Sequence, residues 1–112
     1  MTDNTADTQA AVTVTRNDAE GRYEVAVGGE LAGFTVFIDH GERQRIFPHT
    51  EVFEQFGGRG LSSVLVRDAL ADTRAAGRHV VPVCPLVKKY VTKHPEAADV
   101  DPVTPEILAA LR

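Results

Sequence analysis

The sequence predicts a domain of the α+β class, in which four antiparallel strands precede a helix, a fifth strand and a second helix. Three observations lead to this prediction. Apolar and polar residues alternate through residues 11–52, apolar residues recur at helical spacing through residues 60–76, and a glycine-rich turn separates the two patterns. Alternation is typical of a strand with one buried face, whereas a repeat of three to four residues is typical of an amphipathic helix.

The first two strands are predicted by alternation. Val12 and Val14 alternate with threonines, and residues 22–27 alternate polar and apolar side chains. The second run ends at Gly28-Gly29. Two adjacent glycines favour a two-residue hairpin turn, because both can adopt positive φ angles. We therefore expect a hairpin at this point.

The third and fourth strands are predicted over Leu31 to Ile38 and Arg45 to Val52, on either side of the polar turn 39–42. Gly33 interrupts the third strand and marks a candidate bulge. Pro48 lies inside the fourth strand and has no N–H to donate to a sheet ladder. The fourth strand should therefore bulge, break or border an opening in the sheet.

Helical spacing begins after the glycine-rich turn. Apolar residues recur every three or four positions from Gly60 to Ala76, and Gly77 stands where a helix stop belongs. The β-branched run from His79 to Val83 then predicts a strand parallel to the fourth one, reached by a right-handed crossover. Proline favours the first turn of a helix, so a second helix is expected from Pro85 to Lys93.

The C-terminal segment predicts one more short helix. Thr104 and Pro105 form a typical pair of N-cap and first helical residue. Ile107, Leu108 and Leu111 follow at spacings that place them on one face. We expect this helix to dock on the rest of the domain through that face.

Length and composition are those of one globular domain, which we expect to cover residues 11–112. Residues 1–10 are polar and lack a period, so they predict a flexible leader. Apolar residues make up 43% of the chain and charged residues 25%, which is ordinary for a soluble protein. The net charge of −4 argues against general binding to nucleic acid.

The cellular compartment is predicted from the first residues, from the lengths of the apolar runs and from the one cysteine. No apolar run approaches the ~20 residues that cross a bilayer, and the first residues lack the basic and apolar regions of a signal peptide. The one cysteine, Cys84, cannot form an internal disulfide, which fits a reducing compartment. We therefore expect a cytoplasmic protein that contacts no membrane and holds no metal.

The turn between the fourth strand and the first long helix has the composition of a phosphate site. Gly57, Gly58 and Gly60 let main-chain N–H groups approach an anion with no Cβ in the way. The helix that follows adds unpaired amides and the positive end of its dipole. Two interpretations stand: the glycines bind the diphosphate of a cofactor, or they only make the turn.

The order of elements is similar to that of the N-acetyltransferase superfamily that uses acetyl-CoA, and the chain resembles in particular a small branch with a near-minimal domain. Four sequence blocks carry the resemblance, in order between residues 45 and 100. They are His49-Thr50-x-Val52, Gly57-Gly58-Arg59-Gly60-Leu61, Pro82-x-Cys84-Pro85 and His94-Pro95-Glu96. Residues before 45 match only in pattern. The resemblance implies an acyl-CoA N-acyltransferase fold, in which the fourth and fifth strands splay apart.

The resemblance also implies a place for acetyl-CoA as cosubstrate. The pantetheine arm would enter the gap between the splayed strands and contact main-chain groups near Val52. Amides from Gly57 to Ser62, including that of Leu61, would bind the diphosphate. Arg59 either adds a charge-assisted contact or is a solvated turn residue.

The turn departs from the usual superfamily pattern, which is Gln or Arg, two free positions, Gly, one free position, then Gly or Ala. With Gly60 as the first fixed glycine, Gly57 replaces the Gln or Arg, and Ser62 replaces the last residue. We prefer this frame because it matches the helix start, and a serine hydroxyl can donate to a phosphate oxygen. Shifted by two positions, Gln55, Gly58 and Gly60 match the pattern literally.

Acetylation of an amine requires a group that removes a proton, because a lysine-like amine has a pKa of ~10. His49 lies on the predicted fourth strand and is either this base or a structural histidine. Glu51 is two residues along and hence on the same strand face. It polarises His49, acts as the base itself, or is a solvated charge.

Cys84 lies where a strand leads into a helix N-terminus, a position that favours the reactive thiolate. Three roles compete: an acceptor of the acetyl group in a covalent relay, a hydrogen-bonding neighbour of the cofactor thiol, or a small core residue. Direct transfer is the usual superfamily mechanism, so we rank the relay below the other two roles. Tyr90 is either the acid that protonates the departing thiolate or a packed aromatic residue. Lys88 and Lys89 either reach the ribose phosphate of the cofactor or form a solvated helix face.

The leading hypothesis is therefore an acetyl-CoA dependent N-acetyltransferase that acts on an unidentified primary amine of a protein or small molecule. The alternative is a noncatalytic acyl-CoA binding or sensing module, and a third hypothesis is an interaction domain with a structural glycine turn. The segment between Arg16 and Arg22 is too short for the helices that usually help to form the acceptor pocket in the superfamily. An open acceptor site suits a protein side chain or terminus, or a site that the second subunit of a homodimer completes.

Overall fold

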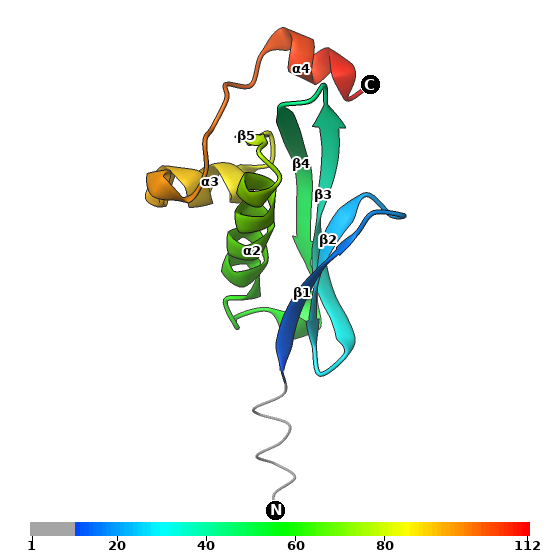
Figure 1. Ribbon diagram of the computed structural model, residues 1–112. Coiled ribbons are helices and arrows are strands. Elements are labelled where there is room, and N and C mark those ends of the chain that lie inside the picture. Colours follow the sequence, from blue (N-terminus) through cyan, green and yellow to red (C-terminus); the bar gives the residue numbers. More distant parts are fainter. Residues whose placement is uncertain (1–10) are drawn as a thin grey trace, which may run out of the picture.

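A computed structural model describes residues 11–112, so the predicted leader 1–10 lies outside the described residues. Five strands form a single sheet in the order β1-β2-β3-β4-β5 (Figure 1). The strands are β1 (Val12–Asn17), β2 (Arg22–Val27), β3 (Glu30–His40), β4 (Gln44–Val52) and β5 (His79–Val81). The first four are antiparallel neighbours, and β5 pairs with β4 in parallel. The α+β class is confirmed. The sheet is mixed and has five strands, because β5 joins the four antiparallel strands in parallel.

The helices follow the strands in the predicted order. They are α2 (Leu61–Ala75), α3 (Pro85–Lys93) and α4 (Pro105–Ala110), with short 3-10 turns η1 (Glu54–Phe56) and η2 (Pro95–Ala97). In Figure 1, α2 and α3 lie on the same side of the sheet, whereas α4 lies at the end of the sheet near the tips of β3 and β4. No helix in the described part of the chain is long and apolar enough to cross a membrane.

Glycines shape the sheet at two places. Gly28 and Gly29 have φ angles of 58° and 86° and form the predicted hairpin between β2 and β3. The register between these strands shifts between Val25 and Ala26, which places the bulge beside Gly33 as predicted. A Cβ on Gly33 would lie 2.5 Å from the carbonyl oxygen of Glu51, so only glycine allows β3 and β4 to approach this closely.

Pro48 produces the irregularity that its missing N–H predicts. Val36 pairs with His49 and Ile38 pairs with Ile46, so Pro48 and the residue before it together oppose a single residue of β3. Two residues facing one is a β-bulge. The bulge lies in the middle of β4, at the point where this strand also loses its pairing with β5.

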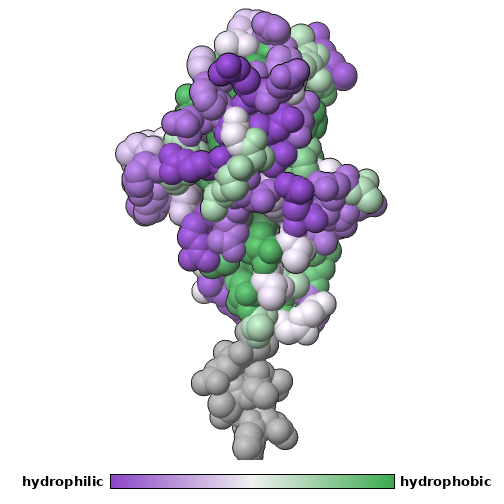
Figure 2. Space-filling model, viewed as in Figure 1, coloured by the Kyte–Doolittle hydropathy of each residue, from purple (hydrophilic) through white to green (hydrophobic). Residues whose placement is uncertain are grey.

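The core lies between the sheet and α2, with α3 closing its side. The fully buried side chains include an aromatic pair from the sheet and aliphatic residues from the sheet and both helices: Tyr23, Val25, Phe47, Leu65, Leu70, Val80 and Val87. On the face seen in Figure 2, hydrophilic residues cover most of the surface, and apolar residues are visible mainly toward the lower end of the domain.

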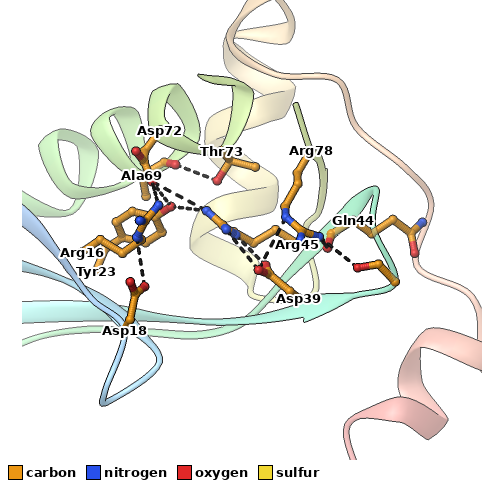
Figure 3. A network of polar contacts seen from close by, with 11 residues as sticks. Arg16, Asp18, Tyr23, Asp39, Gln44, Arg45, Ala69, Asp72, Thr73 and Arg78 are labelled. Carbon is orange, nitrogen blue, oxygen red and sulfur yellow. Dashed lines mark hydrogen bonds and ion pairs between the residues drawn. The ribbon is translucent and has the colours of Figure 1, made fainter. Parts of the chain in front are cut away.

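A buried polar network ties α2 to the sheet (Figure 3). The guanidinium of Arg45, which is 5% exposed, donates to the carboxylate of Asp39 at 2.6 and 3.1 Å and to the hydroxyl of Tyr23 at 2.6 Å. The Tyr23 hydroxyl donates in turn to Asp72 on α2 at 2.7 Å. Burial raises the pKa of Tyr23, and the hydrogen bond from Arg45 lowers the pKa of Asp39. These contacts fix the position of α2 and therefore of the glycine turn that precedes it.

Two predictions about the last elements are wrong. The fifth strand ends at Val81 and does not reach Val83, because Pro82 has no N–H with which to continue the ladder. In α4, Thr104 caps the helix by accepting from the Ile107 N–H, and Ile107 is buried as predicted. Leu108, however, is 47% exposed, because a helix of this length rests on the domain through one narrow stripe.

Candidate active site

The glycine turn leaves the N-terminus of α2 without a side-chain cap. Gly58 and Gly60 have φ angles of 78° and 72°, and a Cβ on either residue would meet no atom within 4 Å. Gly60 is the N-cap of α2 and has no side chain with which to satisfy the first amides of the helix. The amide of Gly57 is different, because it donates to the Glu54 carbonyl at 3.0 Å. An anion at this turn would therefore meet the amides after Gly57.

A cavity lies beside this turn, between the first turns of α2 and one face of α3. Its volume is about 210 Å³. Ser62, Ser63 and Val66 line it from α2. Leu86, Lys89, Tyr90, Lys93 and His94 line it from α3 and the residue that follows. The cavity combines hydroxyl and cationic groups and contains no carboxylate among its lining residues.

The sheet opens at the start of α3, one of the two helices that line this cavity. β4 and β5 pair only from Gln44 to Ile46 and from His79 to Val81, although β4 continues to Val52. The next contact is a single hydrogen bond, from the Cys84 N–H to the Phe47 carbonyl at 2.8 Å. Beyond that bond, the edge of β4 that faces away from β3 has no strand partner among residues 11–112. Main-chain groups on this edge are therefore available to a ligand.

Cys84 forms the N-cap of α3 and is buried, with 3% of its surface exposed. Its thiol donates to the Thr50 hydroxyl at 3.3 Å, and the Thr35 hydroxyl lies 2.8 Å from that of Thr50. Thr35 also donates to the His49 carbonyl at 3.5 Å. The hydrogen bonds thus run in one direction from the thiol to a main-chain carbonyl. No group in this chain of hydrogen bonds can accept a proton from the thiol as a base.

His49 and Glu51 lie on the other face of β4. Side chains alternate along a strand, so the side chains on either side of Thr50 point away from Cys84. The imidazole of His49 and the carboxylate of Glu51 are 3.4 Å apart and both are exposed. The His49 ring also packs near Phe34, with centroids 6.0 Å apart. The structure therefore brings His49 and Glu51 together and joins Cys84 to Thr50 instead.

Of the remaining candidates, Tyr90 and Arg59 pack against other rings, whereas Gln55 does not. The ring centroids of Tyr90 and His94 are 4.6 Å apart, and both residues line the cavity. The guanidinium of Arg59 lies over the Phe56 ring, 5.5 Å from its centroid. Gln55 lies within η1 and is exposed.

Sequence reasoning did not single out three groups that the structure brings to the site. Thr35 and Thr50 meet across β3 and β4, and Lys93 meets Lys89 at the cavity. Lys93 could have been found from the sequence, because it is four positions from Lys89 and so lies on the same face of the predicted helix. The threonine pair could not be found in this way, because it depends on the register between two strands.

Comparison with known protein families agrees with this geometry. A family model for the GCN5-related N-acetyl-transferase matches residues 22–100, from β2 to the segment after η2. This match covers most of the chain, and the protein belongs to this family. The domain is therefore of an acyltransferase type. No curated protein matches the chain.

Proposed function

We propose that the protein transfers the acetyl group of acetyl-CoA to a primary amine. The observation that carries this proposal is that, within residues 11–112, main-chain groups lack partners in two segments close in sequence, the end of β4 and the start of α2. The uncapped N-terminus of α2 offers amides to a diphosphate, and the unpaired edge of β4 offers groups to an extended amide-containing arm. A carrier that has a diphosphate at one end and amides along its arm matches both surfaces.

The diphosphate is assigned to the amides of Gly58, Arg59, Gly60, Leu61 and Ser62. Gly57 contributes the shape of the turn, since its own amide is bonded to Glu54. The positive φ angles of Gly58 and Gly60 keep the turn open, and the absence of atoms near their Cβ positions leaves space for an anion. Main-chain groups around Val52 are assigned to the arm.

His49 and Glu51 are assigned to proton removal from the amine. Acetyl-CoA supplies the activated thioester. The neutral amine nitrogen forms a bond to the acetyl carbon, the carbon–sulfur bond breaks, and the sulfur leaves as a thiolate. Glu51 lies within 3.4 Å of His49 and stabilises the imidazolium that forms when His49 takes the amine proton. Both side chains are exposed, which suits an acceptor that approaches from solvent.

Direct transfer is favoured over a relay through Cys84. The thiol is buried and already donates to Thr50, and the hydrogen bonds beyond it end at a carbonyl. A nucleophilic cysteine needs a base that takes its proton. We assign Cys84 to hold the end of β4 against α3, beside the place where the thioester would lie.

The experiment that tests the proposal has two parts. Isothermal titration with CoA measures binding, and the release of free thiol from acetyl-CoA in the presence of a panel of primary amines measures transfer. We expect heat in the first and amine-dependent thiol in the second. The absence of heat with CoA would overturn the proposal for the cofactor as well as for the reaction.

A noncatalytic acyl-CoA binding module is the second candidate. The positions of His49 and Glu51 favour it, because both side chains lie on the face of β4 opposite to Cys84 and therefore away from α3. Such a module would give heat with CoA and no thiol with any amine of the panel. An interaction domain would give neither signal.

A further inference from the structure

The cavity between α2 and α3 has a cationic wall on the α3 side. Lys89 and Lys93 are four residues apart and so lie on one helix face, and Tyr90 lies between them. Both lysines line the cavity together with His94. On the opposite wall, Ser62 and Ser63 contribute hydroxyl groups from the first turn of α2. In Figure 2, hydrophilic residues cover the part of α3 that protrudes at the side of the molecule.

The charge of this wall is not neutralised within the domain. None of the ion pairs formed by residues 11–112 includes a lysine. The nearest carboxylate, that of Glu96, lies 3.7 Å from the Nδ1 atom of His94 and forms no ion pair with either lysine. Two lysines four residues apart repel each other and destabilise a helix slightly. An anion in the cavity would relieve this repulsion.

We propose that Lys89 and Lys93 bind the phosphate monoester on the ribose of CoA, and that the protein therefore discriminates CoA from its dephosphorylated form. This inference rests on the proposed function. The diphosphate of CoA is assigned to the turn, and Ser62 belongs both to that turn and to the cavity. The monoester is the other anionic group of the same molecule. Lysine is suited to it as a point charge that contacts a phosphate from several directions.

The size of the cavity agrees with a subsite for one part of a ligand. Its volume of about 210 Å³ is below the ~300–1,000 Å³ of pockets that enclose a whole drug-sized molecule. A phosphate with part of its ribose fits such a space better than an entire nucleotide. The apolar groups of Val66 and Leu86 then form the floor against which the sugar would pack.

The test compares the affinities of two ligands that differ by one phosphate. Isothermal titration is carried out with CoA and with dephospho-CoA on the full chain and on Lys89→Gln, Lys93→Gln and the double variant. Lys88→Gln is the matched control, because Lys88 belongs to the same helix and does not line the cavity. Thermal unfolding of each variant verifies that it is folded, as expected for exposed substitutions on a helix.

We expect the unaltered protein to bind CoA roughly tenfold more tightly than dephospho-CoA, as charge-assisted contacts to one phosphate imply. The double variant should bind both ligands equally, and Lys88→Gln should keep the preference. Equal affinity of the unaltered protein for the two ligands would overturn this inference and leave the proposed function intact. A preference that persists in the double variant would also overturn it. The absence of binding to either ligand would overturn both the inference and the proposed function.

Discussion

Cys84 shows how burial and a hydrogen bond can keep a cysteine thiol unreactive. Its thiol donates a hydrogen bond to the Thr50 hydroxyl. The hydroxyls of Thr50 and Thr35 are hydrogen-bonded to each other, and Thr35 donates to the main-chain carbonyl of His49. A cysteine at a helix N-terminus predicts reactivity when it is partly exposed. Burial and a satisfied thiol reverse that expectation. The residue type alone therefore does not decide the mechanism.

Replacement of Cys84 tests this interpretation. We expect Cys84→Ala to keep acetyl transfer within about tenfold of the unaltered rate, whereas loss of a true nucleophile costs on the order of 10⁴-fold or more. Mass spectrometry of the protein after incubation with acetyl-CoA should show no acetyl adduct on Cys84. Cys84→Ser is the matched control, because it keeps a donor for Thr50. An acetylated Cys84, together with a rate that collapses in both variants, would establish the relay instead.

The N-terminus of α2 is the element that the proposed function needs most. The helix is held near its C-terminal end by the Arg45 network, through Asp72, and it begins at the glycine turn. Gly60 is the N-cap, has a left-handed backbone and has no side chain that could accept a hydrogen bond from the first amides of the helix. The unsatisfied amides are consistent with a site kept open for an anion.

A pair of glycine substitutions separates binding from stability. Gly60→Val should lower the free energy of unfolding by about 1–2 kcal/mol, because φ is positive and side chains strain this conformation. It should also weaken CoA binding at least roughly tenfold, because the new side chain covers the amides. Gly29→Val is the matched control, since Gly29 also has a positive φ and nothing within 4 Å of its Cβ position.

Gly29 lies in the β2–β3 hairpin, away from the turn, so its substitution should cost similar stability and leave CoA affinity unchanged. Both variants are measured by chemical denaturation and isothermal titration. Equal CoA affinities of the two variants would remove the phosphate site from the turn.

The C-terminal helix shows which local predictions depend on tertiary contacts. The cap by Thr104 was predictable, because it involves residues three apart in the chain. The role of Leu108 was not, because α4 packs on the sheet end through Ile107, with Ile46 and Val81 beneath it. Periodicity gives the spacing of apolar residues, whereas the neighbouring surface decides which of them is covered.

The two leucine-sized residues of α4 give a direct measurement of this difference. Ile107→Ala should lower the free energy of unfolding by about 2–4 kcal/mol, because a buried side chain is removed and leaves a cavity. Leu108→Ala should change it by less than about 0.5 kcal/mol, as expected at an exposed position. Urea denaturation of both variants provides the values. Equal losses would mean that α4 docks through a different face in solution.

At the scale of the whole molecule, the elements that short-range chemistry dictates were predictable. The two-glycine hairpin, the bulge at Pro48 and the start of α3 at Pro85 each follow from a residue with restricted or unusual φ angles. The contacts across the sheet were not predictable. Whether Cys84 meets Thr50 or His49 depends on how the segment after β5 is aligned with β4, and a shift of one residue along a strand exchanges its two faces.

Two hydrogen-bonded carboxylates, Asp39 in the Arg45 network and Asp101 beside Gln44 and His79, make the stability of the whole domain depend on pH. Hydrogen bonding by Arg45 lowers the pKa of Asp39, and hydrogen bonds from Gln44 and His79 lower the pKa of Asp101. A carboxyl group whose pKa is lower in the folded state than in the unfolded state binds fewer protons when folded. Its contribution to stability is full above its ordinary pKa of ~3.9 and is lost as the pH falls through the folded value.

We therefore expect the free energy of unfolding to be constant near neutral pH and to fall progressively below a pH of about 4. Asp39→Asn should be less stable than the unaltered protein at pH 7, because Arg45 is buried and loses its ionised partner. The same variant should lose less stability between pH 5 and pH 3, since the group responsible for part of the decline is absent. Urea denaturation at a series of pH values measures both effects. If Asp39→Asn and the unaltered protein lose stability in parallel as the pH falls, the ion pair does not couple the domain to protons.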